Sequence, residues 1–193
     1  MDSKKITLIT GGMRSGKSGY ALSLAHRIAG KKIFIATAQA FDESMSDRIK
    51  KHQEERGEEF TTVEEPIYLA QAASAVPESD VILIDCLTLW VNNLLHYFQE
   101  DAGKIRQQLD LFLDVLTNSP SQTIIVTNEV GLGVASENPL ARAFVDELGS
   151  VNQRVARISS DVILMVAGLP QFIKGVSVYE PMDYSFSRNT THQ

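Results

Sequence analysis

The sequence has 193 residues and only one cysteine, Cys86. A single cysteine excludes an intrachain disulfide and a cysteine-rich zinc site, and it is typical of a reducing compartment. Long apolar runs are missing too, since none reaches the roughly 18 residues of a membrane-spanning helix. The stretch Ile6–Thr10 is too short for the core of a secretory signal peptide. We therefore expect a cytoplasmic protein without a membrane span.

Positive charge is scarce as well. Lysine and arginine together number 18 against 24 aspartates and glutamates, which gives a formal net charge of -6. A general nucleic-acid binder needs clustered cations to neutralise phosphates, so no nucleic-acid partner is expected. Hydrophobic residues make up 44% and charged residues 22% of the chain, which excludes disorder over most of its length.

The apolar residues that are present gather in short, nearly continuous runs separated by helical patterns. Continuous apolarity is typical of strands buried on both faces of a parallel sheet. The alternation predicts an α/β fold with a mostly parallel central sheet flanked by helices. The predicted strands are Lys5–Thr10, Lys32–Thr37, Val81–Asp85, Thr123–Thr127 and Asp161–Val166, with a weaker candidate at Glu59–Val63. The predicted helices are Lys17–Ala29, Ser44–Arg56, Ile67–Ala75, Leu87–Phe98, Ile105–Leu116 and Leu140–Ile158.

No linker or repeat divides the chain, so a single domain is expected over residues 1–175. Asp101–Lys104 and Asn118–Gln122 are predicted to be loops, and Gly175–Glu180 a small strand. Residues 176–193 form a C-terminal extension whose polar end is expected to be partly disordered.

The residues between the first predicted strand and helix match the phosphate-loop pattern G-x-x-x-x-G-K-[ST]. Glycines let backbone N–H groups surround a phosphate, and the start of the helix adds a positive dipole end. We expect Lys17 to reach the β- and γ-phosphates from an exposed cleft position, and Ser18 to bind Mg²⁺. The alternative is a glycine-rich turn without a ligand. The eight residues are Gly11, Gly12, Met13, Arg14, Ser15, Gly16, Lys17 and Ser18.

Two further strand ends carry polar side chains. Asp85 follows four apolar residues and is a candidate for the acidic group that holds Mg²⁺; the alternative is a cap for the next helix. Asn128 and Glu129 follow another predicted strand and should face the same crevice, because ligands of open parallel sheets bind at the carboxyl ends of strands. A polar turn with a capping asparagine explains these two residues equally well.

The predicted helix Ser44–Arg56 carries a histidine beside cations. Arg48, His52 and Arg56 recur at steps of four and share one face with Met45 and Ile49. Two arginines beside a histidine suit an anionic ligand, and a neutral imidazole can attack phosphorus. On these residues alone, a purely structural histidine remains the alternative.

Taken together, the motifs resemble the adenosylcobinamide kinase / adenosylcobinamide-phosphate guanylyltransferase family. The phosphate loop alone is unspecific, whereas the ordered set, spread over roughly residues 5–170, is highly specific. The matching segments are T-G-G-M-R-S-G-K-S (10–18), I-A-T-A (35–38), R-I-K-K-H-Q-E-E-R (48–56), T-V-E-E-P (62–66), L-I-D-C-L-T (83–88), V-T-N-E-V-G-L-G (126–133), N-P-L-A-R-A-F (138–144) and G-S-V-N-Q-R (149–154). Lys51, Phe60 and Ser136 depart from residues common in the family.

The resemblance implies a P-loop NTPase with a RecA-like sheet, in which Lys17 is catalytic and His52 is the residue that becomes guanylylated. Ser18 and Asp85 would bind Mg²⁺. The nucleotide contacts implied beyond the phosphate loop are Ala36, Thr37, Ala38, Gln53, Glu54, Glu55, Arg56, Glu64 and Asp85.

The implied activity has two steps. ATP or GTP phosphorylates the aminopropanol hydroxyl of adenosylcobinamide, and GTP then donates GMP through the histidine to give adenosylcobinamide-GDP. The resemblance also implies a homotrimer, with the corrinoid bound between subunits. A simple P-loop small-molecule kinase, which leaves His52 without a role, and a RecA-like nucleotide-dependent switch, which would bind no corrinoid, are the competing hypotheses.

Overall fold

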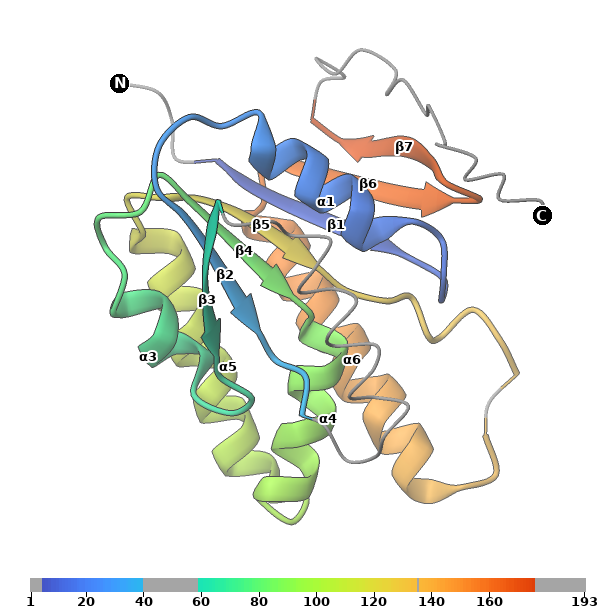
Figure 1. Ribbon diagram of the computed structural model, residues 1–193. Helices are drawn as coiled ribbons and strands as arrows, with labels where there is room; N and C mark the ends of the chain where they lie inside the picture. Colours follow the sequence, from blue (N-terminus) through green and yellow to red (C-terminus); the bar gives the residue numbers. More distant parts are fainter. Residues whose placement is uncertain (1–4, 40–58, 135, 176–193) are drawn as a thin grey trace, which may run out of the picture.

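The computed structural model describes residues 5–39, 59–134 and 136–175, which form a mostly parallel sheet with helices on both faces (Figure 1). The strand order is β3-β2-β4-β5-β1-β6-β7, and only the β6–β7 pair is antiparallel. The predicted α/β fold is thereby confirmed. None of the helices in these described ranges is long and apolar enough to cross a membrane.

Six of the seven strands lie close to where the sequence predicts them. The inner residues of the five central strands are almost all buried, as expected for strands covered on both faces, whereas those of the two edge strands are half-buried or exposed. The strands are β1 (Ile6–Gly11), β2 (Lys32–Ala36), β3 (Phe60–Glu64), β4 (Val81–Asp85), β5 (Gln122–Val126), β6 (Asp161–Val166) and β7 (Leu169–Lys174).

Two apolar layers hold the helices against the sheet. Because side chains alternate along a strand, Ile9 and Leu83 pack with α1 on one face. Leu8 and Ile82 pack on the other face with α3, α4, α5 and α6. The helices are α1 (Lys17–His26), α3 (Leu69–Ser74), α4 (Leu87–Tyr97), α5 (Ala102–Asn118) and α6 (Pro139–Ile158).

The structure corrects two sequence predictions. Asp101–Lys104 is not a loop, because the Asp101 side chain accepts hydrogen bonds from the amides of Gly103 and Lys104 and so begins α5 one turn early. The strand β7 was missed, because its residues do not form a continuous apolar run. Ala167 and Gly168 both have positive φ (50° and 83°), as in the tight turns that join antiparallel strands.

The remaining predictions differ only at element ends or lie outside the described residues. The predicted loop Asn118–Gln122 shortens, because Asn118 ends α5 and Gln122 begins β5. The predicted helix Ser44–Arg56, nearly all of the predicted strand Gly175–Glu180 and the extension 176–193 lie outside the ranges that the structure describes.

Candidate active site

The carboxyl ends of four strands bring residues far apart in the sequence into one row. Glu64 on β3 pairs with Ala36 on β2, Ala36 pairs with Asp85 on β4, and Asp85 pairs with Val126 on β5. With strands about 4.8 Å apart, Glu64 and Asp85 stand about 10 Å from one another along this row. The row forms the crevice edge at which parallel sheets bind ligands.

The phosphate loop adjoins the same edge, between β1 and α1 (Figure 1). Gly11 has a φ of +145°, and a Cβ at this position would stand 2.4 Å from the Met165 carbonyl oxygen. Only glycine therefore fits where β1 turns into the loop. Gly12, Met13 and Arg14 are exposed at the tip, so the loop presents its outer half to solvent.

The β6–β7 turn supports the other end of this loop. The Gly168 amide donates a hydrogen bond to the Ser15 carbonyl at 3.0 Å. Gly16 has a φ of +93°, and a Cβ on it would lie 3.3 Å from the Gly168 Cα. The backbone of the hairpin thus holds Gly16, the residue that caps the start of α1, which explains why two glycines meet here.

Lys17 lies inside the loop rather than in an exposed cleft. Lys17 is only 7% exposed, and its Nζ donates a 2.6 Å hydrogen bond to the Gly12 carbonyl. The expectation of an exposed position was wrong, because the first residue of α1 sits beneath the loop and its ammonium points back into it. Ser18, the next residue, is half-buried at the same helix end.

Asp85 does not cap α4. The capping position belongs to Cys86, which makes no side-chain cap hydrogen bond, and Asp85 stands one residue earlier at the end of β4. The capping alternative is therefore wrong. A half-buried carboxylate remains at the strand end, in a position suited to a Mg²⁺ bound through waters.

Thr37 links the ends of β2 and β4. It is fully buried; its hydroxyl donates to the Cys86 carbonyl at 2.7 Å and accepts from the Cys86 amide at 2.8 Å. Its own amide donates to the Asp85 carbonyl, and its carbonyl accepts from Asn93 Nδ2 at 2.8 Å. The hydroxyl of Thr37 is thus committed to this link. Nucleotide contact by Thr37 and its half-buried neighbour Ala38 stays a prediction.

The cysteine and the two histidines of the described residues are poorly suited to act as a covalent nucleophile at this site. Burial, and then the Asp85 carboxylate, raise the pKa of the Cys86 thiol to about 12, so it is protonated at neutral pH. His26 and His96 lie in the last turns of α1 and α4. Each helix is about 15 Å long and begins near the carboxyl ends of the strands, so both histidines lie at the far ends of their helices. His52 and residues Gln53–Arg56 fall outside the described ranges, so their predicted roles stay predictions.

Glu129 is connected to the carboxyl end of β1 through a hydrogen-bond network that the sequence did not predict. Its amide donates to the Gly11 carbonyl at 3.2 Å, and its Oε1 accepts a 2.9 Å hydrogen bond from the Thr10 hydroxyl. Asn152 on α6 is 7% exposed and donates from Nδ2 to the Asn128 carbonyl and, at 3.4 Å, to Glu129 Oε1. Its Oδ1 accepts from the Thr127 hydroxyl at 2.7 Å.

The network decides between the two explanations of Asn128 and Glu129. Asn128 caps no helix; its amide donates to the Thr88 hydroxyl at 2.9 Å, and Asn138 caps α6 instead. Asn152 lies in the segment G-S-V-N-Q-R that carries part of the family resemblance. That segment was the sequence signal that could have pointed to Asn152. The sequence alone does not show, however, which loop a residue on a helix will contact.

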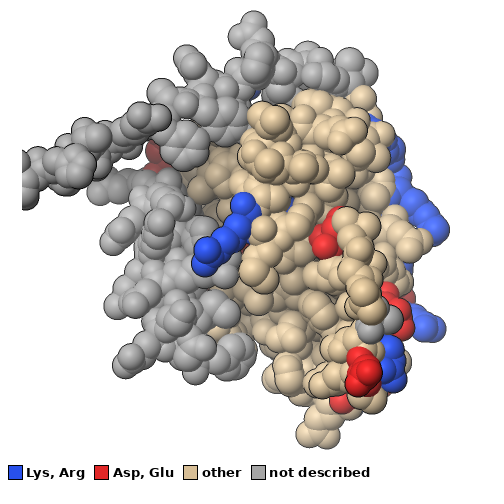
Figure 2. Space-filling model, turned by 90° about the vertical axis from the view of Figure 1, so that its right-hand side faces the viewer, with Lys and Arg blue, Asp and Glu red and all other residues tan. Residues whose placement is uncertain are grey.

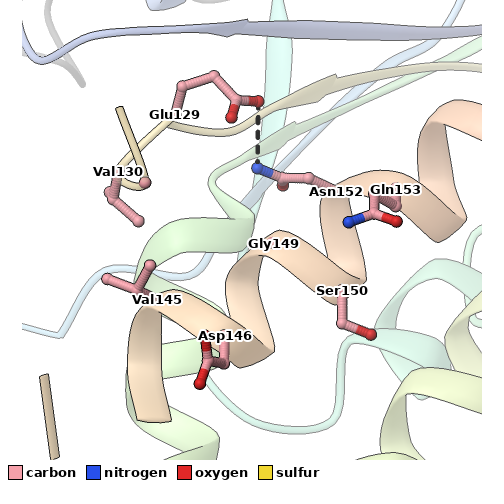
Figure 3. A pocket seen from close by; sticks show the side chains of 9 residues that line it. Glu129, Val130, Val145, Asp146, Gly149, Ser150, Asn152 and Gln153 are labelled. Atoms are coloured by element: carbon pink, nitrogen blue, oxygen red, sulfur yellow. Dashed lines mark hydrogen bonds between the residues drawn. The ribbon is translucent and has the colours of Figure 1, made fainter. Parts of the chain in front are cut away.

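A cavity of about 330 Å³ opens beside this network, between the loop after β5 and α6. Figure 3 shows the side chains of Val130 and Val145 on one side and the amides of Asn152 and Gln153 on the other, with Glu129 above. The site therefore offers two carboxylates, those of Glu129 and Asp146, together with two amides and an apolar wall.

The surrounding surface carries little charge. Figure 2 shows the side of the molecule on the right of Figure 1; the described residues there are mainly uncharged, and acidic and basic side chains lie next to one another along one edge. Groups of three or more histidine, cysteine or acidic side chains able to cage a metal are absent from residues 5–39, 59–134 and 136–175. Local groups, rather than a broad field, must therefore position any charged ligand.

Comparisons with known proteins agree with one another. The model of a family described as cobinamide kinase / cobinamide phosphate guanyltransferase matches residues 7–173. The bifunctional adenosylcobalamin biosynthesis protein CobP of Pseudomonas aeruginosa is 41% identical over 169 residues, which cover 87% of this chain and 96% of that protein. The bifunctional adenosylcobalamin biosynthesis protein CobU of Escherichia coli is 35% identical over 179 residues, covering 86% and 98%.

A solved structure matches at the level of the fold. A prototypical ATPase from the type III secretion system of pathogenic bacteria aligns with a TM-score of 0.51 and 12% identity, covering 83% of this chain and 51% of that one. Together with the strand order and the phosphate loop, this supports the predicted P-loop NTPase architecture.

Proposed function

Since the chain belongs to the cobinamide kinase / cobinamide phosphate guanyltransferase family, we propose that it phosphorylates adenosylcobinamide and then converts the product to adenosylcobinamide-GDP. The observation that carries this proposal is the family match over 7–173, which spans both the phosphate loop and the row of strand ends beside it. The enzyme is a kinase and a nucleotidyltransferase of adenosylcobalamin biosynthesis.

The kinase step takes place at the phosphate loop. The loop amides, the N-terminus of α1 and the Lys17 ammonium surround the β- and γ-phosphates of ATP or GTP. Phosphoryl transfer needs little beyond positioning and charge neutralisation. Because Lys17 Nζ lies 2.6 Å from the Gly12 carbonyl, its charge is already aimed into the loop before a nucleotide arrives.

The transferase step is assigned to His52. A neutral imidazole attacks the α-phosphorus of GTP, pyrophosphate leaves, and the phosphorylated corrinoid then takes the GMP. This splits one difficult displacement into two easier ones. The protonated state of the Cys86 thiol supports the assignment, because it removes the one cysteine as a competing nucleophile at neutral pH.

Ser18 and Asp85 are proposed as the Mg²⁺ ligands. A hydroxyl at the start of α1 and a half-buried carboxylate that caps no helix fit a hard cation that keeps most of its waters. The ion would neutralise charge on the phosphates. Gln53, Glu54, Glu55, Arg56 and Glu64, with Ala36–Ala38, complete the proposed nucleotide contacts.

Replacement of Asp85 by asparagine is expected to raise the Mg²⁺ concentration needed for half-maximal rate by about 10–100-fold in both reactions. The amide keeps the shape of the side chain and removes the negative charge. Magnesium titrations of both activities measure the effect, with Asp114→Asn, an exposed residue of α5, as a matched control. Overlapping titration curves for Asp85→Asn and the unaltered protein would show that Asp85 does not serve the metal.

The assembly and location of the enzyme are part of the same proposal. A homotrimer is proposed from the family resemblance, and the exposed apolar side chains of Val166, Leu169 and Ile173 at the β6–β7 edge support association between copies without fixing their number. A cytoplasmic location suits an enzyme that consumes ATP and GTP. Corrinoid binding between subunits remains part of the proposal.

The proposal is tested by incubating the protein with adenosylcobinamide, ATP, GTP and Mg²⁺ and separating the corrinoids by chromatography. ATP alone is expected to give adenosylcobinamide phosphate, and ATP with GTP to give adenosylcobinamide-GDP. A simple kinase would stop at the first product. A nucleotide-dependent switch would hydrolyse nucleotide slowly and give neither corrinoid product.

A further inference from the structure

The carboxylate of Glu129 is held on one side and open on the other. The hydrogen bonds from Thr10 and Asn152 both reach Oε1, at 2.9 and 3.4 Å. Within the described part of the chain, no hydrogen bond reaches Oε2, and the residue is half-buried. Two donors on a single oxygen fix the orientation of the carboxylate and leave the second oxygen available to accept a proton.

The position of Glu129 places this oxygen next to the phosphate loop. The Glu129 amide bonds to the carbonyl of Gly11, the first residue of the loop, and β5 lies directly between β1 and β4. Glu129 therefore stands between the loop that holds the γ-phosphate and the strand that ends in Asp85. A catalytic base for phosphoryl transfer must reach the attacking hydroxyl at this place.

The adjoining cavity has the size and lining for an alcohol-bearing arm. Its volume of about 330 Å³ corresponds to on the order of ten waters, far too little for a corrin ring. An aminopropanol arm presents a methyl group, an amide and a hydroxyl. The apolar wall of Val130 and Val145 suits the methyl group, Gln153 suits the amide, and Glu129 suits the hydroxyl (Figure 3).

We infer that Glu129 is the general base of the kinase step and that this cavity receives the aminopropanol arm while the corrin ring stays outside. The inference rests on the proposed function, which names the acceptor alcohol. The hydroxyl oxygen forms a bond to the γ-phosphorus, and the bond between that phosphorus and the β,γ-bridging oxygen breaks. The hydroxyl proton passes to Glu129 Oε2 and then to solvent, and the nucleoside diphosphate leaves with the electron pair.

The first test replaces Glu129 by glutamine in the full-length protein. Formation of adenosylcobinamide phosphate from ATP and adenosylcobinamide is expected to fall by about 100-fold or more, the usual contribution of a general base. Labelling of the protein by GTP, and GMP transfer to separately prepared adenosylcobinamide phosphate, should stay within a few-fold of the unaltered protein, since neither removes the proton of that hydroxyl. Glu147→Gln makes the same chemical change on α6 at a residue that does not line the cavity.

A second pair of variants separates a base from a structural residue. Formate added to Glu129→Ala should restore part of the kinase rate, because it supplies a carboxylate to the vacated space; it should not help Glu129→Gln. Val145→Trp should fill the cavity and raise the KM for adenosylcobinamide at least tenfold, with protein labelling by GTP unchanged.

Each outcome has a clear consequence. Kinase activity of Glu129→Gln within about threefold of the unaltered protein would overturn the role of Glu129. Equal loss of kinase activity and protein labelling would overturn it too, because Glu129 would then belong to a shared nucleotide pocket. An unchanged corrinoid KM in Val145→Trp would overturn the cavity assignment. If the unaltered protein makes no corrinoid phosphate, the proposed function itself fails.

Discussion

Replacement of Lys17 by alanine is expected to reduce both phosphorylation of adenosylcobinamide and GMP transfer by at least 100-fold. The variant loses the cation that we propose to contact the phosphates, and removal of one such preorganised donor typically costs 100- to 1,000-fold. The effect should be larger on turnover than on folding, because the buried ammonium has the Gly12 carbonyl, a neutral group of its own loop, as a bond partner.

Rates of both reactions at saturating nucleotide, together with the thermal unfolding midpoint, measure this prediction. Lys31→Ala removes a lysine side chain at an exposed position before β2 and provides the matched control. Rates close to those of the unaltered protein in Lys17→Ala would mean that the loop does not bind the reacting phosphates. A large drop in the unfolding midpoint would instead show that Lys17 stabilises the fold.

Replacement of His52 by alanine is expected to remove GMP transfer completely while leaving the kinase step within a few-fold of the unaltered rate. Positioning and charge neutralisation at the phosphate loop require no imidazole. The transferase step needs a nucleophile that attacks and later departs. Lys51 offers a nitrogen on the same segment, but an amine with an ordinary pKa near 10.4 is almost fully protonated at neutral pH.

Chromatography of the two corrinoid products separates the possible outcomes for His52→Ala. His96→Ala alters an exposed histidine in the last turn of α4 and serves as the control. Retention of GMP transfer would move the covalent site to another residue. Equal loss of both products would mean that His52 shapes a nucleotide pocket common to the two steps.

The sequence predicted the interior of the fold well because burial leaves a strong pattern. The runs Val81–Asp85 and Asp161–Val166 match β4 and β6 residue for residue, since strands covered on both faces need continuous apolar side chains. β7 was not predicted because it is an edge strand with exposed Leu169 and Ile173, and an edge strand does not need a continuous apolar run. The turn between β6 and β7 nevertheless supports the phosphate loop, so a strand that the sequence did not predict helps to shape the site.

The candidate site was predictable only as far as local motifs reach. The phosphate-loop pattern placed Lys17 correctly at the start of α1 but did not predict that it is buried. Its burial depends on how the loop folds back over α1. Asp85 could be recognised at a strand end, and the structure removed its capping alternative. The contacts of Glu129 with Thr10 and Asn152 join residues 119 and 23 positions apart, a separation that no spacing rule predicts.

The most direct measurement of the central claim is the labelling of the protein by GTP that carries its radioactive phosphate at the α position, with γ-labelled GTP in parallel. The account predicts that α-label, but not γ-label, stays on the denatured protein through a bond that acid breaks and base does not, as expected for a phosphoramidate. Added adenosylcobinamide phosphate should remove the label and yield labelled adenosylcobinamide-GDP. Absence of α-label from the protein under conditions that form adenosylcobinamide-GDP, or a label that survives acid, would contradict a histidine intermediate.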